Sequence, residues 1–174
     1  MKIFSLIGNL FDRLFVVAGA CIGSQIPQFM HQYIERLAGH VDALKKLINQ
    51  LDQIAAGSNK HLDQYIQKFK ESIDIDFNRQ GDFLQGIVDR WQELNKTLEQ
   101  MTQSPFWQRP YYFFKDFQAD IAHSTFDSFQ PGFNLTIEGG CYALVGMLIG
   151  WSFYQTIIQL FALGYSTIQS FFKK

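Results

Sequence analysis

The chain has 174 residues, of which 47% are hydrophobic and 18% charged, with a formal net charge of −1. This length fits one domain, and the near-neutral charge excludes a general electrostatic attraction to nucleic acid or anionic lipid. The mean hydropathy of −0.06 conceals a split, because both ends of the chain are apolar while the middle is polar and patterned like a helix.

The N-terminal segment, residues 1–33, is predicted to be an uncleaved transmembrane helix. A bilayer core requires about 20 apolar residues, and the run Leu14–Phe29 reaches that length only with Phe4–Phe11 added. Asp12 and Arg13 would then lie near the headgroups or face protein. Because these charges interrupt the run, a cleaved secretory signal is disfavoured. A hydrophobic core helix of a soluble protein is the alternative.

The central region, residues 34–135, is predicted to be a helical, coiled-coil-like extramembrane domain. Its apolar residues recur in alternating steps of three and four, which is the heptad pattern. The first seam consists of Ile34, Leu37, Val41, Leu44, Ile48, Leu51 and Ala55. Gly57-Ser58-Asn59 then predicts a helix end followed by a new cap.

A second seam follows, with a disturbance inside it. The pattern favours one long, irregular helix over residues 59–102, ended by Ser104-Pro105 because proline does not fit a helix interior. Two helices with a break near Asn78–Asp82 are the alternative, since Asp74–Phe77 and Gly81 interrupt the spacing. The seam consists of Ile66, Phe69, Ile73, Leu84, Ile87, Trp91, Leu94, Leu98 and Met101.

A third helix is predicted from near Pro110 to Pro131-Gly132. Its aromatic face either packs on the other helices or lies at the membrane surface, where aromatic rings are favoured. Packing is the preferred interpretation. The face consists of Phe113, Phe114, Phe117, Ile121, Phe126 and Phe129.

The C-terminal segment, residues 136–174, is predicted to be the second transmembrane helix. Cys141–Phe172 carries no charge and is long enough to cross a bilayer. Thr136 is a plausible cap for this helix, with Glu138 in its first turn. Positive residues stay in the cytoplasm, so Lys173-Lys174 places both termini there and the central region in the periplasm.

Small and polar residues within the two spans indicate how the helices associate. In lipid, small residues favour association because they let two backbones approach closely. The spacing leaves open whether that contact lies within one chain or between chains. The residues are Gly19, Gly23, Ala143, Gly146 and Gly150. Polar groups in the second span could bond between helices, lie near the interface or line a pathway; they are Gln155, Thr156 and Gln159.

The chain carries none of the familiar catalytic or metal-binding motifs. None of its four histidines belongs to an HExxH pair, and no cysteine lies near them in sequence for a zinc site. Gly139-Gly140 lacks the lysine and spacing of a phosphate loop. Cys21 and Cys141 lie in the apolar ends and are expected to be unpaired. The expectation is therefore no enzyme, no cofactor and no metal.

Several stretches near both ends resemble an uncharacterised bacterial family, domain of unknown function 2937. The stretches are Gln25–Phe29, Gln32-Tyr33, Arg36-Leu37, Gly39-His40, Glu138-Gly139 and Gly146–Trp151. The middle is similar only in its helical character. The resemblance implies a small bacterial inner-membrane protein with two spans, and it brings no activity or catalytic residue.

The predicted fold is all-α: a membrane-anchored helical hairpin with two transmembrane helices and a coiled-coil-like extramembrane region. The expected function is structural, as a self-assembling inner-membrane protein with a periplasmic helical scaffold. Exposed seams on a thin hairpin are hard to bury within one copy, which favours a homo-oligomer in contact with membrane lipid and not with nucleic acid. The alternatives are an accessory subunit of a larger membrane transport or envelope complex, and an oligomeric pore.

Overall fold

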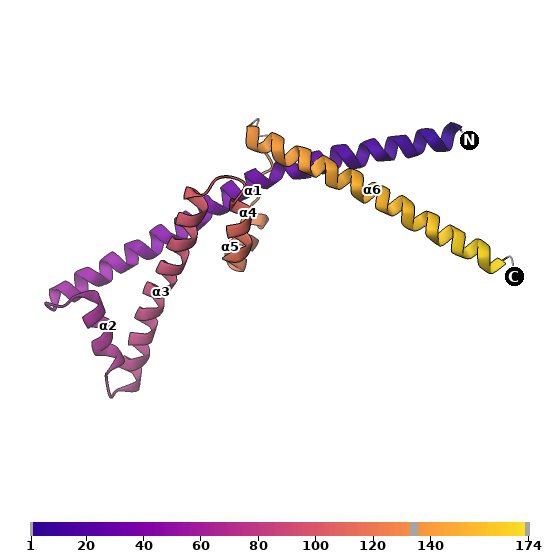
Figure 1. Ribbon diagram of the computed structural model, residues 1–174. Coiled ribbons are helices and arrows are strands. Elements are labelled where there is room, and N and C mark those ends of the chain that lie inside the picture. Colours follow the sequence, from indigo (N-terminus) through magenta and orange to yellow (C-terminus); the bar gives the residue numbers. More distant parts are fainter. Residues whose placement is uncertain (1, 133–135, 173–174) are drawn as a thin grey trace. The chain divides into compact units, whose positions relative to one another are not determined.

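The structure, a computed structural model, describes residues 2–132 and 136–172 (Figure 1). Within those residues it is all-helical, which confirms the predicted class. The helices are α1 (Lys2–Gly57), α2 (Leu62–Lys70), α3 (Ile75–Gln103), α4 (Arg109–Lys115), α5 (Ala119–Asp127) and α6 (Ile137–Phe172).

The chain divides into two compact units. The terminal unit comprises Met1–Met30 and Phe129–Lys174, and the central unit comprises His31–Ser128. The two ends of the chain therefore belong to one body. Helix α1 contributes to both units, because it runs without interruption past residue 30.

The terminal unit contains two helices that are long and apolar enough to cross a membrane. The stretches concerned are Leu10–Gly57 of α1, which continues into the central unit, and Ile137–Leu160 of α6. Only 11% and 17% of their most apolar stretches are buried. Helix α6 begins as predicted, because the Thr136 hydroxyl oxygen accepts the Gly139 N–H at 3.1 Å.

The central unit buries its apolar residues among five helical segments of one chain. Every predicted seam residue in α1, and every one from Leu84 onward in α3, is buried or half-buried. The heptad positions are therefore covered within a single copy. The side chains with the least exposure in this unit are Tyr33, Leu37, Ala55, Ile66, Leu94, Met101 and Ile121.

The long helix favoured over residues 59–102 is wrong, because the chain breaks between α2 and α3 at residues 71–74. Asp74 caps the new helix, where its carboxylate accepts the Asp76 N–H at 3.0 Å. Ile73 lies in this break and is fully exposed, so it does not belong to a seam. The alternative break near Asn78–Asp82 is also wrong, since those residues lie inside α3.

Two further boundaries follow the sequence and one does not. Helix α1 ends at Gly57, and α3 ends at Gln103 just before Ser104, both as predicted. The third predicted helix is instead two short helices, α4 and α5, separated at residues 116–118. Its aromatic face splits accordingly: Phe113 and Ile121 are buried, whereas Phe114, Phe117 and Phe126 are exposed.

Candidate functional site

Helices α1 and α6 cross in the terminal unit through direct backbone contact between glycines (Figure 1). A Cβ atom added to Gly23 would lie 3.1 Å from the Gly146 Cα atom, and one added to Gly19 would lie 3.2 Å from the Gly150 Cα atom. Each would also collide with a carbonyl oxygen of the other helix. No side chain larger than hydrogen fits at these positions without moving a backbone.

The pairing shows that the two helices run antiparallel. Moving forward along α1 from Gly19 to Gly23, the neighbours move backward along α6, from Gly150 to Gly146 and then to Tyr142. In this structure the glycines meet within one chain. Ala143 is half-buried, and Tyr142 rather than Ala143 lies against Gly23.

Beyond the glycines, Tyr154 ties α6 to the beginning of α1. Its hydroxyl donates to the Gly8 carbonyl oxygen at 2.6 Å. Its ring and that of Phe153 pack on Phe15, with centroid distances of 5.6 and 6.0 Å. Sequence reasoning missed Tyr154, although it follows Gly146 and Gly150 at steps of four and therefore shares their helix face.

The polar residues predicted within the second span are not gathered at the crossing. Gln155 is half-buried, whereas Thr156 and Gln159 are exposed. The Thr156 hydroxyl donates to the Ser152 carbonyl oxygen at 2.8 Å. Its hydrogen-bond donor is therefore satisfied within its own helix.

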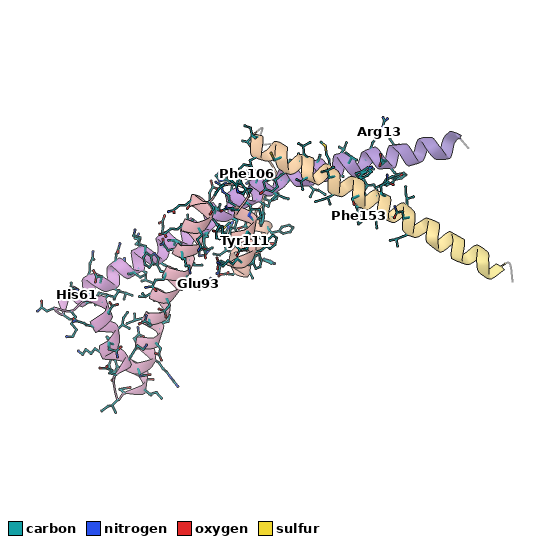
Figure 2. The ribbon with its side chains drawn as sticks, in the orientation of Figure 1. Arg13, His61, Glu93, Phe106, Tyr111 and Phe153 are labelled. Atoms are coloured by element: carbon teal, nitrogen blue, oxygen red, sulfur yellow. The ribbon has the colours of Figure 1, made fainter. Side chains whose placement is uncertain are left out.

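The two neighbouring charged residues of α1, Asp12 and Arg13, differ in their surroundings. Asp12 is half-buried, and its Oδ1 atom has no hydrogen-bond partner in the described part of the chain. Arg13 is exposed and points away from α6 (Figure 2). The pair is therefore not joined in an ion pair among the described residues.

The chain leading into α6 is also fastened to α1 inside the terminal unit. The Gln25 side-chain oxygen accepts the Gly132 N–H at 3.1 Å. The Phe29 and Phe129 rings meet edge to face at a centroid distance of 5.8 Å. The stretch Gln25–Phe29, one of those that carry the family resemblance, thus holds the entry to the second long helix.

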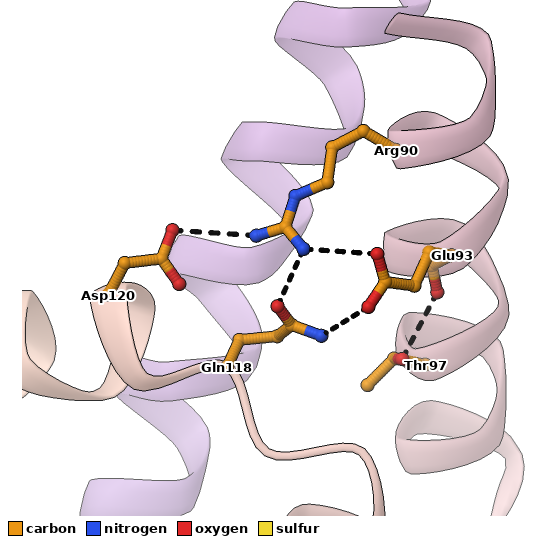
Figure 3. A network of polar contacts seen from close by, with 5 residues as sticks. All are labelled: Arg90, Glu93, Thr97, Gln118 and Asp120. Atoms are coloured by element: carbon orange, nitrogen blue, oxygen red, sulfur yellow. Dashed lines mark hydrogen bonds and ion pairs between the residues drawn. The ribbon is translucent and has the colours of Figure 1, made fainter. Parts of the chain in front are cut away.

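In the central unit, one polar cluster joins α3 to the start of α5 (Figure 3). We call it the Arg90 cluster; it consists of Arg90, Glu93, Gln118 and Asp120. The Arg90 guanidinium donates to the Gln118 side-chain oxygen at 2.7 Å and to the Glu93 carboxylate at 3.1 Å. It also reaches the Asp120 carboxylate at 3.4 Å. The Gln118 amide closes the ring by donating to Glu93 at 2.9 Å.

These contacts determine the electrostatics of the cluster. The hydrogen bond from Gln118, and then that from Arg90, hold the pKa of Glu93 below its ordinary value of 4.5. Gln118 is buried, whereas the charged side chains are partly open to solvent. Because the polar groups bond to one another, the cluster links α3 to the first turn of α5. Sequence reasoning missed it, since Arg90 and Gln118 are 28 residues apart and form no motif.

The described residues hold no group of three or more metal-binding side chains. Cys21 and Cys141 are unpaired and exposed. Unpaired cysteines were expected from the sequence, because both lie in the apolar ends.

Comparison with known families gives one clear relationship. Neither the comparison with curated proteins nor that with solved structures gives a match. The family model described as "Protein of unknown function (DUF2937)" matches residues 7–166, which include most of both crossing helices and the whole central unit. This confirms the resemblance seen at the two ends, and the chain belongs to the DUF2937 family.

Proposed function

We propose that this chain is a structural protein of the bacterial inner membrane. The terminal unit spans the bilayer as a helical hairpin, and the central unit is a periplasmic scaffold that assembles with further copies. The observation that carries the proposal is the glycine crossing of two long apolar helices whose other faces are almost entirely uncovered.

The exposed apolar side chains of α1 and α6 favour a lipid environment over water. Full burial of one large apolar side chain is worth about 1.5–3 kcal/mol, so leaving ten of them in water would cost roughly 15–30 kcal/mol if each were fully exposed. Lipid removes that cost, and in lipid close glycine contacts are a main source of helix association. The exposed residues of this kind include Leu10, Leu14, Val17, Ile22, Leu144, Val145, Leu148, Ile149, Phe153 and Leu160.

The orientation follows from the charges at the helix ends. The antiparallel crossing supports a hairpin with both of its open ends on one side of the bilayer. In the sequence, Lys2 is at the start of α1, and Lys173 and Lys174 come after the last residue of α6. Positive residues stay in the cytoplasm. The central unit is then periplasmic.

Assembly is proposed from the apolar surface of the central unit and not from the heptad seams, which are covered within one copy. Ile73, Ile75 and Phe77 are exposed at the junction of α2 and α3, and we call them the α2–α3 patch. Beside it is an open pocket of about 480 Å³ lined by Leu51, Ile54, Tyr65, Phe69, Asp76, Phe77, Gln80 and Leu84. Contiguous exposed apolar surface of this kind marks protein–protein contact sites.

A structural role is favoured over an enzymatic one. The most extensive polar cluster described is the Arg90 cluster, whose side chains are engaged with one another. No nucleophile lies beside a base within it. An accessory subunit of a larger complex would use the same α2–α3 patch for a different partner.

Two measurements test the proposal. The first is topology and membrane retention. A reporter that works only in the cytoplasm should be active when it is fused after Lys174, and a reporter that works only in the periplasm should be active when it is inserted at Ser58, in the exposed α1–α2 turn. Washing with alkaline carbonate should leave the chain in the membrane. The opposite topology would refute the proposed orientation, and release by carbonate would refute membrane anchoring.

The second measurement is the native mass of the complex in mild detergent. The expected mass is a multiple of 20.2 kDa. Phe77→Ser should lower this mass, whereas Phe126→Ser should not, since Phe126 is even more exposed (72% against 53%) but lies on α5, outside the α2–α3 patch. A single 20.2 kDa species refutes self-assembly. Stoichiometric foreign subunits would identify the accessory role instead.

A further inference from the structure

We propose that the outer side of α4 lies in the headgroup region of the membrane, as a third attachment besides the two spans. The surface concerned, which we call the α4 aromatic face, consists of Trp107, Tyr111 and Phe114. The proposal rests on the membrane anchoring proposed above, and it adds a specific lipid contact for the central unit.

The geometry gives α4 two different sides. Tyr111 and Phe114 are three residues apart in α4, which places them on one helix face. Trp107 lies in the turn just before the helix. The three side chains, in chain order, are 65%, 63% and 75% exposed. Phe113 is buried instead, with its ring edge to face against Tyr33 at 4.9 Å. One aromatic side thus holds α4 on the central unit, and the other projects outward, as Tyr111 does in Figure 2.

The chemistry of the α4 aromatic face fits a lipid headgroup layer better than water or a protein groove. Trp and Tyr combine an apolar ring with one polar group, and this combination concentrates them at membrane interfaces. The Lys115 ammonium lies 6.0 Å from the centre of the Tyr111 ring, on the same side of the helix. A lysine beside such rings can keep its stem in the apolar layer and its charge at the lipid phosphates.

The connection to α6 keeps α4 and α5 close to the membrane. Only nine residues separate the end of α5 at Asp127 from the start of α6 at Ile137. Fully extended, they reach no further than about 30–32 Å. The α2–α3 patch differs in both respects, since it has neither Trp nor Tyr and lies far along the chain from either span.

The three tryptophans of the chain provide the test, because they lie in three different surroundings. Trp151 is in the second span, Trp107 is on the α4 aromatic face, and Trp91 is half-buried in α3. Full-length chains that keep one tryptophan, with Phe at the other two positions, are reconstituted in vesicles of phosphatidylethanolamine and phosphatidylglycerol. Their fluorescence is then quenched either by lipids that carry a nitroxide at defined depths or by acrylamide in the water.

The expected result is that Trp107 is quenched most by shallow nitroxides, at a depth of about 5–10 Å below the headgroup boundary. Trp151 should be quenched by lipid nitroxides in the acyl region, and Trp91 by none of them. Phe114→Ser should reduce lipid quenching of Trp107 at least twofold. Phe83→Ser, which removes an exposed Phe near the start of α3, should leave it unchanged.

Each other result overturns the inference in a distinguishable way. Acrylamide quenching of Trp107 without lipid quenching places α4 in water. Protection of Trp107 from both quenchers places a second protein surface over it. If Trp151 also escapes lipid quenching, the membrane anchoring itself fails. If loss of Trp91 unfolds the central unit, the depth is measured in a chain that keeps all three tryptophans. In that chain Cys21→Ser and Cys141→Ser remove the native thiols, and a nitroxide label attached at Tyr111→Cys reports the depth of α4 in the bilayer.

Discussion

Replacement of Gly146 by alanine should weaken the crossing of α1 and α6. The added Cβ atom would lie 2.9 Å from the Gly19 carbonyl carbon and 3.1 Å from the Gly23 Cα atom. It would also collide with the Gly19 carbonyl oxygen, which is the nearest of the three atoms. Carbon atoms pack best at about 3.5–4.0 Å, and the oxygen is closer still, so the two backbones must separate by about 1 Å. A gap of this size forfeits roughly a quarter to a half of the dispersion energy of the contacts affected.

The magnitude follows from the rigidity of the neighbours. Both groups that the methyl meets are backbone atoms, so no side chain can rotate away. Overpacking of this kind costs about 1–3 kcal/mol. Gly140→Ala is the matched control on the same helix, because a Cβ atom there meets nothing within 4 Å. The Gly140 substitution should be neutral or stabilising by up to about 1 kcal/mol, since alanine favours a helix over glycine.

The assay is the free energy of separating the two helices in mixed micelles. Donor and acceptor dyes are attached to Cys21 and Cys141, the two cysteines of the chain, which are exposed and lie on the two helices. Transfer efficiency is followed as dodecyl sulfate is added. The reasoning is refuted if Gly146→Ala separates no more easily than Gly140→Ala.

Three further predictions concern single contacts. Tyr154→Phe removes the hydrogen bond from α6 to the α1 backbone and should cost about 0.6–1.7 kcal/mol in the same transfer assay; no change would mean that the hydroxyl bonds elsewhere. Gly81→Ala should lower the urea midpoint of the full chain, because its Cβ atom would lie 2.6 Å from the backbone nitrogen of the last residue of α2, whereas Gly86→Ala, with open space, should not. Because the pKa of Glu93 is lowered on folding, its contribution to stability is present above about pH 4.5 and is lost as the pH falls through the folded value. Urea unfolding across that range should therefore show a loss that Glu93→Gln reduces, and equal pH dependence of the two proteins would contradict the assignment.

The parts of the fold that the sequence predicts are those encoded by local signals. The apolar ends stand out because a bilayer-length run without charge is rare. The ends of α1 and α3 at Gly57 and Gln103 follow from glycine, serine and proline acting on their own turns. The glycines four residues apart predict a shared helix face, and the structure places that face in a crossing within one chain.

The features that the sequence did not predict depend on tertiary structure. Asp74 was interpreted as a disturbance in a seam, whereas it caps α3 and leaves Ile73 fully exposed. The Arg90 cluster joins residues 25–30 positions apart, and such pairings leave no periodic trace. Heptad spacing therefore predicted burial in α1 and from Leu84 onward in α3, but it failed at Ile73 and did not identify the packing partners.

The glycine crossing also has a consequence for biosynthesis. Its two halves, around Gly19 and Gly146, are separated by more than a hundred residues of chain. At synthesis rates of about 5–20 residues per second, Gly146 is synthesised on the order of ten seconds after Gly19. A message truncated before α6 would yield a product in which Gly19 and Gly23 have no partner helix, and we expect quality-control proteases to degrade it.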